Sequence, residues 1–347
     1  MAIVVLQLPD VKQERNERPQ QCPYCAGVTF QRWGGGEKPV RDVHCRRVWV
    51  YRYRGGHCGR TFRHYPAGSS RADQTERLKR LAVVCWTLGL SHRSVSRILS
   101  GLQVRLSPMS VWRDAQEQAE QIRQHHRWRK VGVLGVDGAL VTGWGDKRPV
   151  LVAVDLGAGQ VVEVGQVNEY DLHAVVRWLQ GLVQRLGVKV IVTDDLYVYR
   201  TVSEQLPVGH QVCQFHARRW IGKTLKALHE TVPKDWQWVL GEVEELIEFL
   251  PPEGDKRLYA LWKQLGVRRT GRGRALSAVE QLRDLLLRLS QRWASYCTFQ
   301  GEPQVPWTNN RSEQAIGRMK MRARTVRGYK TWKGMQTGLL LAGGFQF

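Results

Sequence analysis

Long apolar runs are missing from this sequence of 347 residues, and no stretch approaches the roughly 20 residues that a membrane-spanning helix needs. The start of the chain has only a short apolar stretch with no basic segment before it, so we expect no secretory signal there. Cysteine is also scarce, and seven unevenly spaced cysteines do not predict a disulfide framework. These absences argue against membrane and secreted proteins and favour a reducing, cytoplasmic compartment.

Acidic residues are few compared with basic ones. The 31 Asp and Glu residues face 53 Lys and Arg residues, which gives a formal net charge of +22. This excess predicts a polyanionic partner, nucleic acid before an acidic membrane. The hydrophobic fraction of 42% indicates a globular protein, and the length allows two or three domains.

Composition and periodicity divide the chain into six expected segments. They are a leader at 1–21, a cysteine-containing DNA-binding unit at 22–68, a helix-turn-helix at 69–127, the first part of an α/β core at 128–225, a helical insertion at 226–300 and the last part of the core at 301–347. Within the core, Val-rich runs predict strands at 131–136, 150–154, 161–167, 188–193 and 208–213, with a helix at 170–186. This order favours a mixed sheet with a parallel part.

Three carboxylates stand at notable places in the core. Asp137 and Asp194 each end a predicted strand, and Glu313 lies at the start of a basic helix. Functional groups gather at the carboxyl ends of strands in α/β sheets, so we expect the two aspartates to converge. Three oxygen ligands in a basic protein fit a two-magnesium site for phosphoryl chemistry. Taken singly, each acid also fits a helix cap, a capping box or a turn.

Four motifs together resemble the DDE transposases of bacterial insertion sequences, which are similar to Mutator-like enzymes with a helical insertion. They are Gly135-Val-Asp-Gly138, Val192-Thr-Asp-Asp195, Cys213-Gln-Phe-His216 and Thr308-Asn-Asn-Arg-Ser-Glu313. The resemblance covers most of the chain. It implies an RNase H-like catalytic core with an all-helical insertion, preceded by a zinc-ribbon-like unit and a helix-turn-helix.

The resemblance also implies a role for each matching residue. Asp137, Asp194 and Glu313 would hold two Mg²⁺ ions, for which Mn²⁺ can substitute. Asp195 competes as the second ligand, and Asp194 is preferred because it directly follows the apolar strand. Cys213 and His216 lie near the site. They would bind zinc only with further ligands, none of which stands nearby in the sequence, and the alternative is a buried cysteine beside a locally bonded histidine.

The cysteine-rich start contains half of a zinc ribbon, Cys22-Pro-Tyr-Cys25. The family pattern expects a second C-x-x-C before Gly-Arg-Thr-Phe, but Gly55 stands in place of its first cysteine and only Cys58 is present. Cys45 is the expected fourth ligand of a structural Zn²⁺, with His44 and His57 as alternatives. A small arginine-rich fold with free thiols is the other interpretation.

Two regions are expected to contact DNA. Helices at 74–88, 91–100 and 108–124 predict a helix-turn-helix whose third helix offers Ser110, Trp112 and Arg113 to a groove, although plain helical packing gives the same pattern. In the basic helix after Glu313, Lys320, Arg322 and Arg324 are expected to clamp phosphates.

The leading hypothesis is therefore a transposase that binds the ends of its insertion sequence and a target DNA. Synapsis of two ends would require at least a homodimer, associated with the nucleoid through DNA. A DNA-binding regulator derived from a transposase is the first alternative. A nuclease that cuts without joining is the second.

Overall fold

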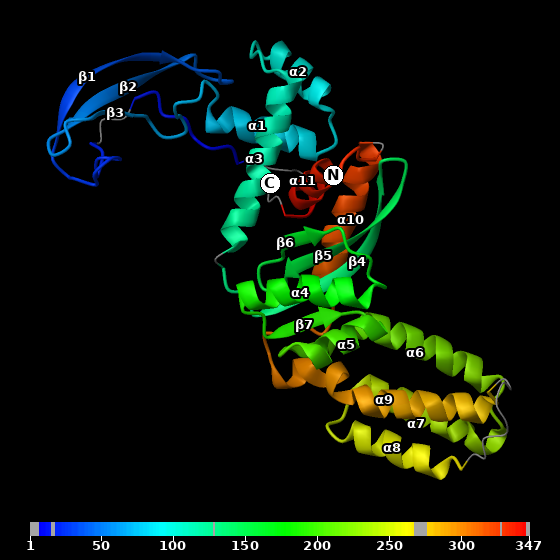
Figure 1. Ribbon diagram of the computed structural model, residues 1–347. Coiled ribbons are helices and arrows are strands. Elements are labelled where there is room, and N and C mark those ends of the chain that lie inside the picture. Colours follow the sequence, from blue (N-terminus) through cyan, green and yellow to red (C-terminus); the bar gives the residue numbers. More distant parts are fainter. Residues whose placement is uncertain (1–6, 15–17, 128, 267–275, 327, 345–347) are drawn as a thin grey trace. The chain divides into compact units, whose positions relative to one another are not determined.

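The structure is a computed structural model that describes residues 7–14, 18–127, 129–266, 276–326 and 328–344. The chain forms two compact units (Figure 1). One combines Met1–Ile122 with Met321–Phe347, and the other spans Arg123–Lys320. We call them unit 1 and unit 2. The expected final segment at 301–347 is therefore shared between the two units.

Unit 2 contains a five-stranded sheet in the order β6-β5-β4-β7-β8. The strands are β4 (Val133–Gly143), β5 (Asp146–Asp155), β6 (Gln160–Gly165), β7 (Val190–Thr193) and β8 (Gly209–Val212). Strand β5 runs antiparallel to both of its neighbours, whereas β4, β7 and β8 are parallel to one another. This is the mixed sheet of an RNase H-like core, so the expected fold class is confirmed.

Two helices cover one face of this sheet. Helix α4 (Leu172–Leu186) follows β6, and α5 (Tyr197–Gln205) follows β7. Asp171 caps the start of α4 by accepting from the backbone N–H of Ala174, and Gly187 ends the helix in a left-handed conformation. The apolar faces of both helices pack on buried residues of β4 and β7 in one hydrophobic cluster. After the first of these helices, β7 returns to lie parallel to the first residues of β4, where Val133 pairs with Val190 and Gly135 with Val192.

The start of α10 (Asn310–Thr325) lies against β4 at Gly135. A Cβ atom at Gly135 would collide with the side chains of Ser312 and Asn309, so this glycine permits the close approach. The Asn309 amide also donates from Nδ2 to the carbonyl of Val136 at 3.1 Å. Glycine and amide together fix the start of α10 beside the residues that precede Asp137.

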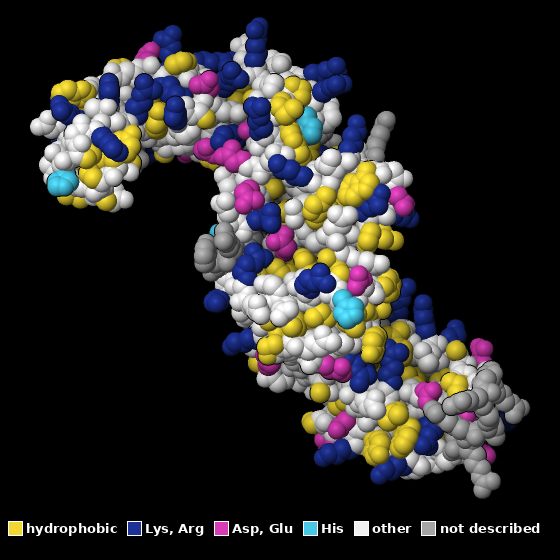
Figure 2. Space-filling view, in the orientation of Figure 1, with side chains coloured by type: hydrophobic (Ala, Val, Ile, Leu, Met, Phe, Trp, Pro, Cys, Tyr) yellow, Lys and Arg dark blue, Asp and Glu magenta, His cyan; other side chains and the backbone are white. Residues whose placement is uncertain are grey.

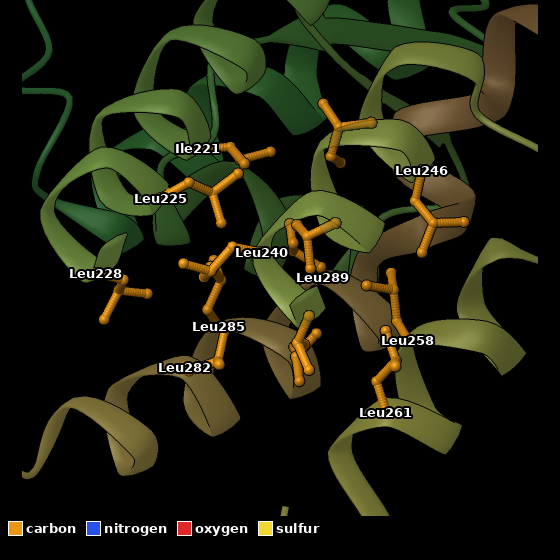
Figure 3. Packing of buried hydrophobic residues seen from close by; sticks show 14 of the residues in the cluster. Ile221, Leu225, Leu228, Leu240, Leu246, Leu258, Leu261, Leu282, Leu285 and Leu289 are labelled. Carbon is orange, nitrogen blue, oxygen red and sulfur yellow. The ribbon is translucent and has the colours of Figure 1, made fainter. Parts of the chain in front are cut away.

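The helical part of unit 2 follows β8. It consists of α6 (Gln214–His229), the short 3₁₀ helix η1 (Lys234–Trp236), α7 (Gln237–Phe249), α8 (Gly254–Gln264) and α9 (Ala278–Gly301). Leucines from these helices, including Leu225, Leu246 and Leu289, pack together in one core (Figure 3). Ser277 and Glu280 form a capping box at the start of α9. Residues 226–300 were expected to be helical, and α7, α8 and most of α9 lie in this range.

Unit 1 combines a small sheet with a group of helices. Strands β1 (Phe30–Pro39), β2 (Arg47–Gly55) and β3 (Thr61–His64) form an antiparallel meander. Helices α1 (Glu76–Thr87), α2 (His92–Gly101) and α3 (Pro108–Arg127) follow, with the last residues of α3 in unit 2. Thr75 and Ser91 cap α1 and α2.

The C-terminal helix α11 (Trp332–Gly344) completes the helical core of unit 1. Leu341 is fully buried in the same cluster as Leu78, Val95 and Val111 from the first three helices. The sequence analysis assigned this segment to the catalytic core. The long separation along the chain hides the contact, because periodicity reports which face of a helix is apolar but not what covers that face.

Asp114 on α3 gives a first test of the packing in unit 1. Its side chain is buried and accepts a hydrogen bond from Gln74 Nε2 at 2.6 Å. Burial raises the pKa of Asp114 to about 6, although the Gln74 hydrogen bond and the charge of Lys79 oppose the rise. The folded state therefore binds this proton more tightly than the unfolded chain, and its contribution to stability falls as pH rises from about 4 to about 6.

We expect Asp114→Asn to raise the free energy of unfolding by up to about 2 kcal/mol at pH 8, because the buried charge is removed. At pH 4 the gain should vanish. Urea unfolding at the two pH values measures both effects. An equal gain at pH 4 and pH 8 would contradict the assignment to Asp114.

Candidate active site

The parallel pairing of β4 and β7 places two aspartates side by side. Gly135 pairs with Val192, and continuing this register by two residues brings Asp137 level with Asp194. Both residues directly follow the fully buried part of their strand, and both side chains are half-buried. The backbone N–H of Gly138 donates to Asp137 Oδ1 at 2.8 Å. The two acids converge as expected, but only Asp194 lies just past the end of its strand. Strand β4 continues to Gly143, so Asp137 lies within its strand and the parallel register, not a shared strand end, places it beside Asp194.

Glu169 is a fourth carboxylate at this place, and the sequence analysis missed it. It lies in the loop between β6 and α4, where a Cβ atom at Gly138 would collide with its carboxylate. The buried hydroxyl of Tyr199 on α5 donates to Glu169 Oε1 at 2.5 Å. The sequence signal for Glu169 is its position between the predicted strand at 161–167 and the predicted helix at 170–186, but no motif surrounds it.

The acids strongly perturb one another. Burial raises the pKa of Asp137 to about 7, and the negative charges of Glu169 and Asp194 add to the rise. Burial and then the Glu169 charge also raise the pKa of Asp194 to about 6. The cluster thus carries less negative charge at neutral pH than its composition suggests. A cation at this place would restore full ionisation of both aspartates.

Glu313 extends from the first turn of α10 toward α6. Its Oε1 lies 3.7 Å from Nδ1 of His216, and neither atom has a hydrogen-bond partner among the described residues. The charge of His216 lowers the pKa of both Asp137 and Asp194, so the histidine is within electrostatic reach of all three predicted acids. Asp194 Oδ1 is likewise buried and unpartnered among the described residues. These free oxygens fit a site for a hard divalent cation.

Cys213 and His216 join Glu313 in a compact set. One ligand atom from each lies within 4.8 Å of the other two. This corrects the expectation that no third ligand stands near the Cys/His pair, because α10 brings Glu313 to it from almost a hundred residues away. In the described part of the chain, such sets form here and at Cys22, Cys25 and Cys58. The carboxylate oxygens of Asp137, Asp194 and Glu313 therefore do not all lie within 4.8 Å of one another.

The Cys213 thiol is held in place by α10. It is buried and accepts from the backbone N–H of Asn309 at 3.3 Å. Burial opposes ionisation of the thiol, but hydrogen bonds from His216 and Asn309 outweigh it and lower the pKa of Cys213. The same contact with Cys213 raises the pKa of His216. Each partner thus stabilises the charged form of the other beside Glu313.

Asp195 makes different contacts from Asp194. Its side chain is almost fully buried, forms an ion pair with Arg292, and accepts from Arg288 at 2.9 Å and Tyr296 at 2.8 Å, all on α9. These contacts attach the end of β7 to the helical part of unit 2. Asp194 instead lies level with Asp137, and the charge of Glu169 acts on it. These contacts favour Asp194 over Asp195 as the candidate metal ligand.

This division of labour predicts opposite effects on stability. Asp195→Asn should lower the free energy of unfolding by about 3–5 kcal/mol, because it leaves the buried Arg292 without its charge partner. Asp194→Asn should leave stability unchanged or raise it at pH 8, since it removes a carboxylate whose pKa is raised by burial. Urea unfolding of the two variants side by side measures the difference. A larger loss in Asp194→Asn would reverse the assignment.

Three of the four candidate zinc ligands come together in unit 1. Cys22 and Cys25 lie on a tight turn in which Ala26 N–H donates to Cys22 O, and Cys58 faces them with its Sγ 3.7 Å from that of Cys22. The N–H of Tyr24 and then that of Cys25 lower the pKa of Cys22, even though burial opposes this. A turn of this kind suits zinc-bound thiolates.

Cys45 does not belong to this set, which corrects the expectation that it is the fourth ligand. It lies in a separate cluster with Val40, Val48 and Val50, and its Sγ donates to Asp42 Oδ1 at 3.6 Å. Burial raises the pKa of the Cys45 thiol, and the Asp42 charge adds to the rise. The position facing the three thiols is occupied by Gly55. A Cβ atom there would lie 2.9 Å from Cys58 Sγ and 3.2 Å from Cys22 Sγ.

The predicted DNA contacts fall into two groups. Arg113, Lys320 and Arg324 are exposed, and Ser110 is half-buried at the start of α3. Trp112 instead packs against Trp86 and His92 in unit 1. Figure 2 shows lysine and arginine side chains distributed over the visible surface, which fits a polyanionic partner for the exposed group.

Arg322 requires a correction. Its side chain is only 3% exposed and its guanidinium lies over the Trp86 ring, 4.4 Å from the ring centre. It therefore does not clamp phosphates on an open surface. The helical period explains the error, because positions 320 and 324 share one face of α10 while 322 lies on the opposite face, toward the core of unit 1.

One protein-family model matches part of this chain. The model of the transposase IS66 family matches residues 173–337. This match includes Asp194, Cys213, His216 and Glu313 but begins after Asp137 and Glu169. It confirms the resemblance to transposases that the motifs indicate. Among curated proteins, none matches the chain.

Three solved structures are similar at low identity. The Drosophila P element transposase strand transfer complex shares 9% identity over 80% of this chain and 94% of that chain, with a TM-score of 0.44. The catalytic core domain of BIV integrase shares 19% over 46% and 82%, with a TM-score of 0.20. The simian T-cell lymphotropic virus intasome shares 12% over 58% and 73%, with a TM-score of 0.23. Scores this low add nothing to the argument from the sheet and the site.

A helix that crosses a bilayer must be both long and apolar. None of the described helices combines the length and the hydropathy that crossing a bilayer requires.

Proposed function

We propose that this chain is a DDE transposase that cuts DNA at the ends of its element and joins those ends to a target. The observation that carries the proposal is the level placement of Asp137 and Asp194 on adjacent parallel strands, with Glu169 against them and Glu313 brought to the same end by α10. The match of 173–337 to a transposase family supports the reaction class.

Asp137, Asp194 and Glu313 would hold divalent cations, with Glu169 as a further carboxylate beside the first two. Bound Mg²⁺ would activate the attacking oxygen and stabilise the leaving one in phosphodiester cleavage and transfer. The protein's own part is to position Asp137, Asp194 and Glu169, whose mutual repulsion favours cation binding, and to bring Glu313 to them on α10. The hydrogen bond from Tyr199 fixes Glu169, and Asn309 fixes the start of α10.

DNA is the partner that this chemistry requires. Exposed basic residues such as Arg113, Lys320 and Arg324 would contact phosphates, so binding should weaken steeply as salt rises. Joining two ends in one complex calls for at least a dimer. Cys22, Cys25 and Cys58 would hold a structural Zn²⁺ through three thiolates, with a ligand from outside the set in the fourth position.

The decisive experiment uses the full chain and a linear duplex that carries both flanks of its own gene, with a supercoiled plasmid as target. With Mg²⁺ or Mn²⁺ we expect nicks at defined flank positions and covalent joining to the plasmid; with EDTA we expect neither. Sequencing of joined products identifies the ends. Nicking without joining would favour the nuclease, and binding without nicking under either metal would favour the regulator.

A further inference from the structure

A cavity of about 690 Å³ lies wholly within unit 1, and neither the acid cluster nor the cysteine set accounts for it. Its walls come from the end of α1, the start of α2 and α3, and the segment that joins α10 to α11. Trp86, His92, Met109, Trp112, Arg322 and Tyr329 are among the residues that line it. The exposed side chain of Met109 marks its opening to solvent.

Three aromatic rings form one wall. Trp86 and His92 are stacked, with ring centres 5.4 Å apart and planes 15° apart. Trp112 meets both edge-on, at 6.2 Å from Trp86 and 5.5 Å from His92. Burial, together with the charge of Arg322, lowers the pKa of His92, so its ring is neutral at neutral pH. The Trp86 ring thus has His92 stacked against it and the Arg322 guanidinium over it, whereas Trp112 meets the other two rings only edge-on. Trp112 is therefore the ring on which a planar ligand can stack.

The buried Arg322 supplies a positive charge to the same cavity. Its Nη1 donates to Thr325 Oγ1 at 2.8 Å, but Nε and Nη2 are buried without a partner among the described residues. Burial lowers the pKa of Arg322, yet a guanidinium remains charged in proteins. Arg93 and Lys330 also line the cavity, and none of its described lining residues is acidic. An unpaired buried guanidinium is costly unless a ligand satisfies it, and two parallel N–H groups suit a phosphate.

We infer that this cavity binds an unpaired nucleotide of DNA, with the base stacked on Trp112 and a phosphate oxygen at Arg322. The inference rests on the proposed function, because it names a feature of the DNA substrate. A cavity of this volume holds a small molecule or one nucleotide but not a duplex. Aromatic faces and a cation together are what proteins use for flipped or single-stranded bases.

Backbone geometry at the rim supports close approach of a ligand. Gly89 and Gly328 line the cavity with positive φ values of 120° and 87°, which side-chain-bearing residues rarely adopt. Gly334 lies against Trp112 on the α11 side. At these three positions no side chain enters the cavity.

The test measures DNA binding by fluorescence anisotropy in EDTA, so that no cleavage contributes. Two labelled duplexes are compared: one blunt, and one with three unpaired nucleotides at an end, prepared in a 5′ and a 3′ version. Wild type should bind one overhang duplex at least about 10-fold more tightly than the blunt one, as stacking of a single base predicts. A 2-aminopurine in the overhang should lose fluorescence on binding, since it stacks on tryptophan.

Two variants address the cavity and one serves as the matched control. Arg322→Met and Trp112→Leu should abolish the overhang preference and the 2-aminopurine signal while retaining affinity for the blunt duplex. Arg324→Ala, an exposed arginine two residues along α10, should weaken both duplexes equally and keep the preference. Circular dichroism confirms that each variant is folded, and a variant that unfolds is replaced by Arg322→Lys or Trp112→Phe.

The inference is overturned if wild type shows no overhang preference, or if the preference survives in both cavity variants. A labelled glutamate-rich peptide is included, and its tight, Arg322-dependent binding in place of the overhang would assign the cavity to an acidic peptide instead. Failure of metal-dependent cleavage by a protein that retains the overhang preference would overturn the proposed function alone.

Discussion

Asp137→Asn should abolish Mg²⁺-dependent cleavage of the element ends while leaving DNA binding largely intact. Asparagine keeps the shape of the side chain and still accepts from the N–H of Gly138, but it removes the negative charge that a divalent cation requires. A lost metal ligand removes several kcal/mol of stabilisation from the transition state, which corresponds to a rate loss of about 10³-fold or more. Single-turnover cleavage of an end-labelled duplex measures the rate, and anisotropy measures binding.

The same variant has a second signature in stability. The pKa of Asp137 is raised to about 7 in the folded protein, so the fold favours the protonated carboxyl and loses stability as pH rises from about 4 to about 7. Asp137→Asn should therefore be more stable than wild type at pH 8.5 without metal, and equal to it below pH 4. Added Mg²⁺ should stabilise wild type but not the variant. Loss of stability at pH 8.5 together with loss of DNA binding would show that Asp137 acts in folding rather than in catalysis.

Glu169→Gln tests whether Glu169 acts on the two aspartates through its charge or is itself a metal ligand. Its carboxylate raises the pKa of both Asp137 and Asp194, so its neutral variant should lower both pKa values and shift the acid limb of the cleavage rate toward lower pH. A rate loss as large as that of Asp137→Asn would instead make Glu169 a ligand of equal weight. Cleavage rates from pH 5.5 to 8.5 distinguish the outcomes.

Much of the core could be predicted from the sequence because its strands are short, Val-rich and separated by turn residues. The predicted convergence of Asp137 and Asp194 is confirmed by the parallel register of β4 and β7, but the strand-end position predicted for Asp137 is wrong, because β4 continues to Gly143. The contacts that distinguish Asp194 from Asp195 come from α9, about a hundred residues away. No local pattern carries that information.

The misplaced residues share a cause. Arg322 and Cys45 were assigned by residue type, because arginine suggests phosphate and cysteine suggests zinc. The role of each residue depends on the groups that pack against it. The guanidinium of Arg322 lies over the Trp86 ring, and the Cys45 thiol packs among valines beside Asp42. Glu169 shows the converse, since its loop has no motif and only the fold brings it to Asp137.

Gly55→Cys should convert the three-thiolate set into a tight zinc site. The Cβ position of Gly55 faces the Sγ atoms of Cys58 and Cys22 at 2.9 and 3.2 Å, on the open side of the set. Gly55 is the last residue of β2 and has an ordinary backbone conformation, so a side chain is tolerated once the flexible Cys58 thiol moves aside. Gly59 N–H already donates to Gly55 O, which holds the turn that carries Cys58.

The expected gain follows from the energetics of structural zinc sites. Such sites bind with about 10–16 kcal/mol, so one of four ligands contributes on the order of 3 kcal/mol, or about 100-fold in affinity. Competition with a chromophoric chelator measures the affinity of wild type and variant. Gly55→Ser adds the same bulk without a thiolate and should show no gain. Equal affinity in the cysteine and serine variants would mean that the three thiols do not form a zinc site, and that this small sheet is held by its aromatic packing alone.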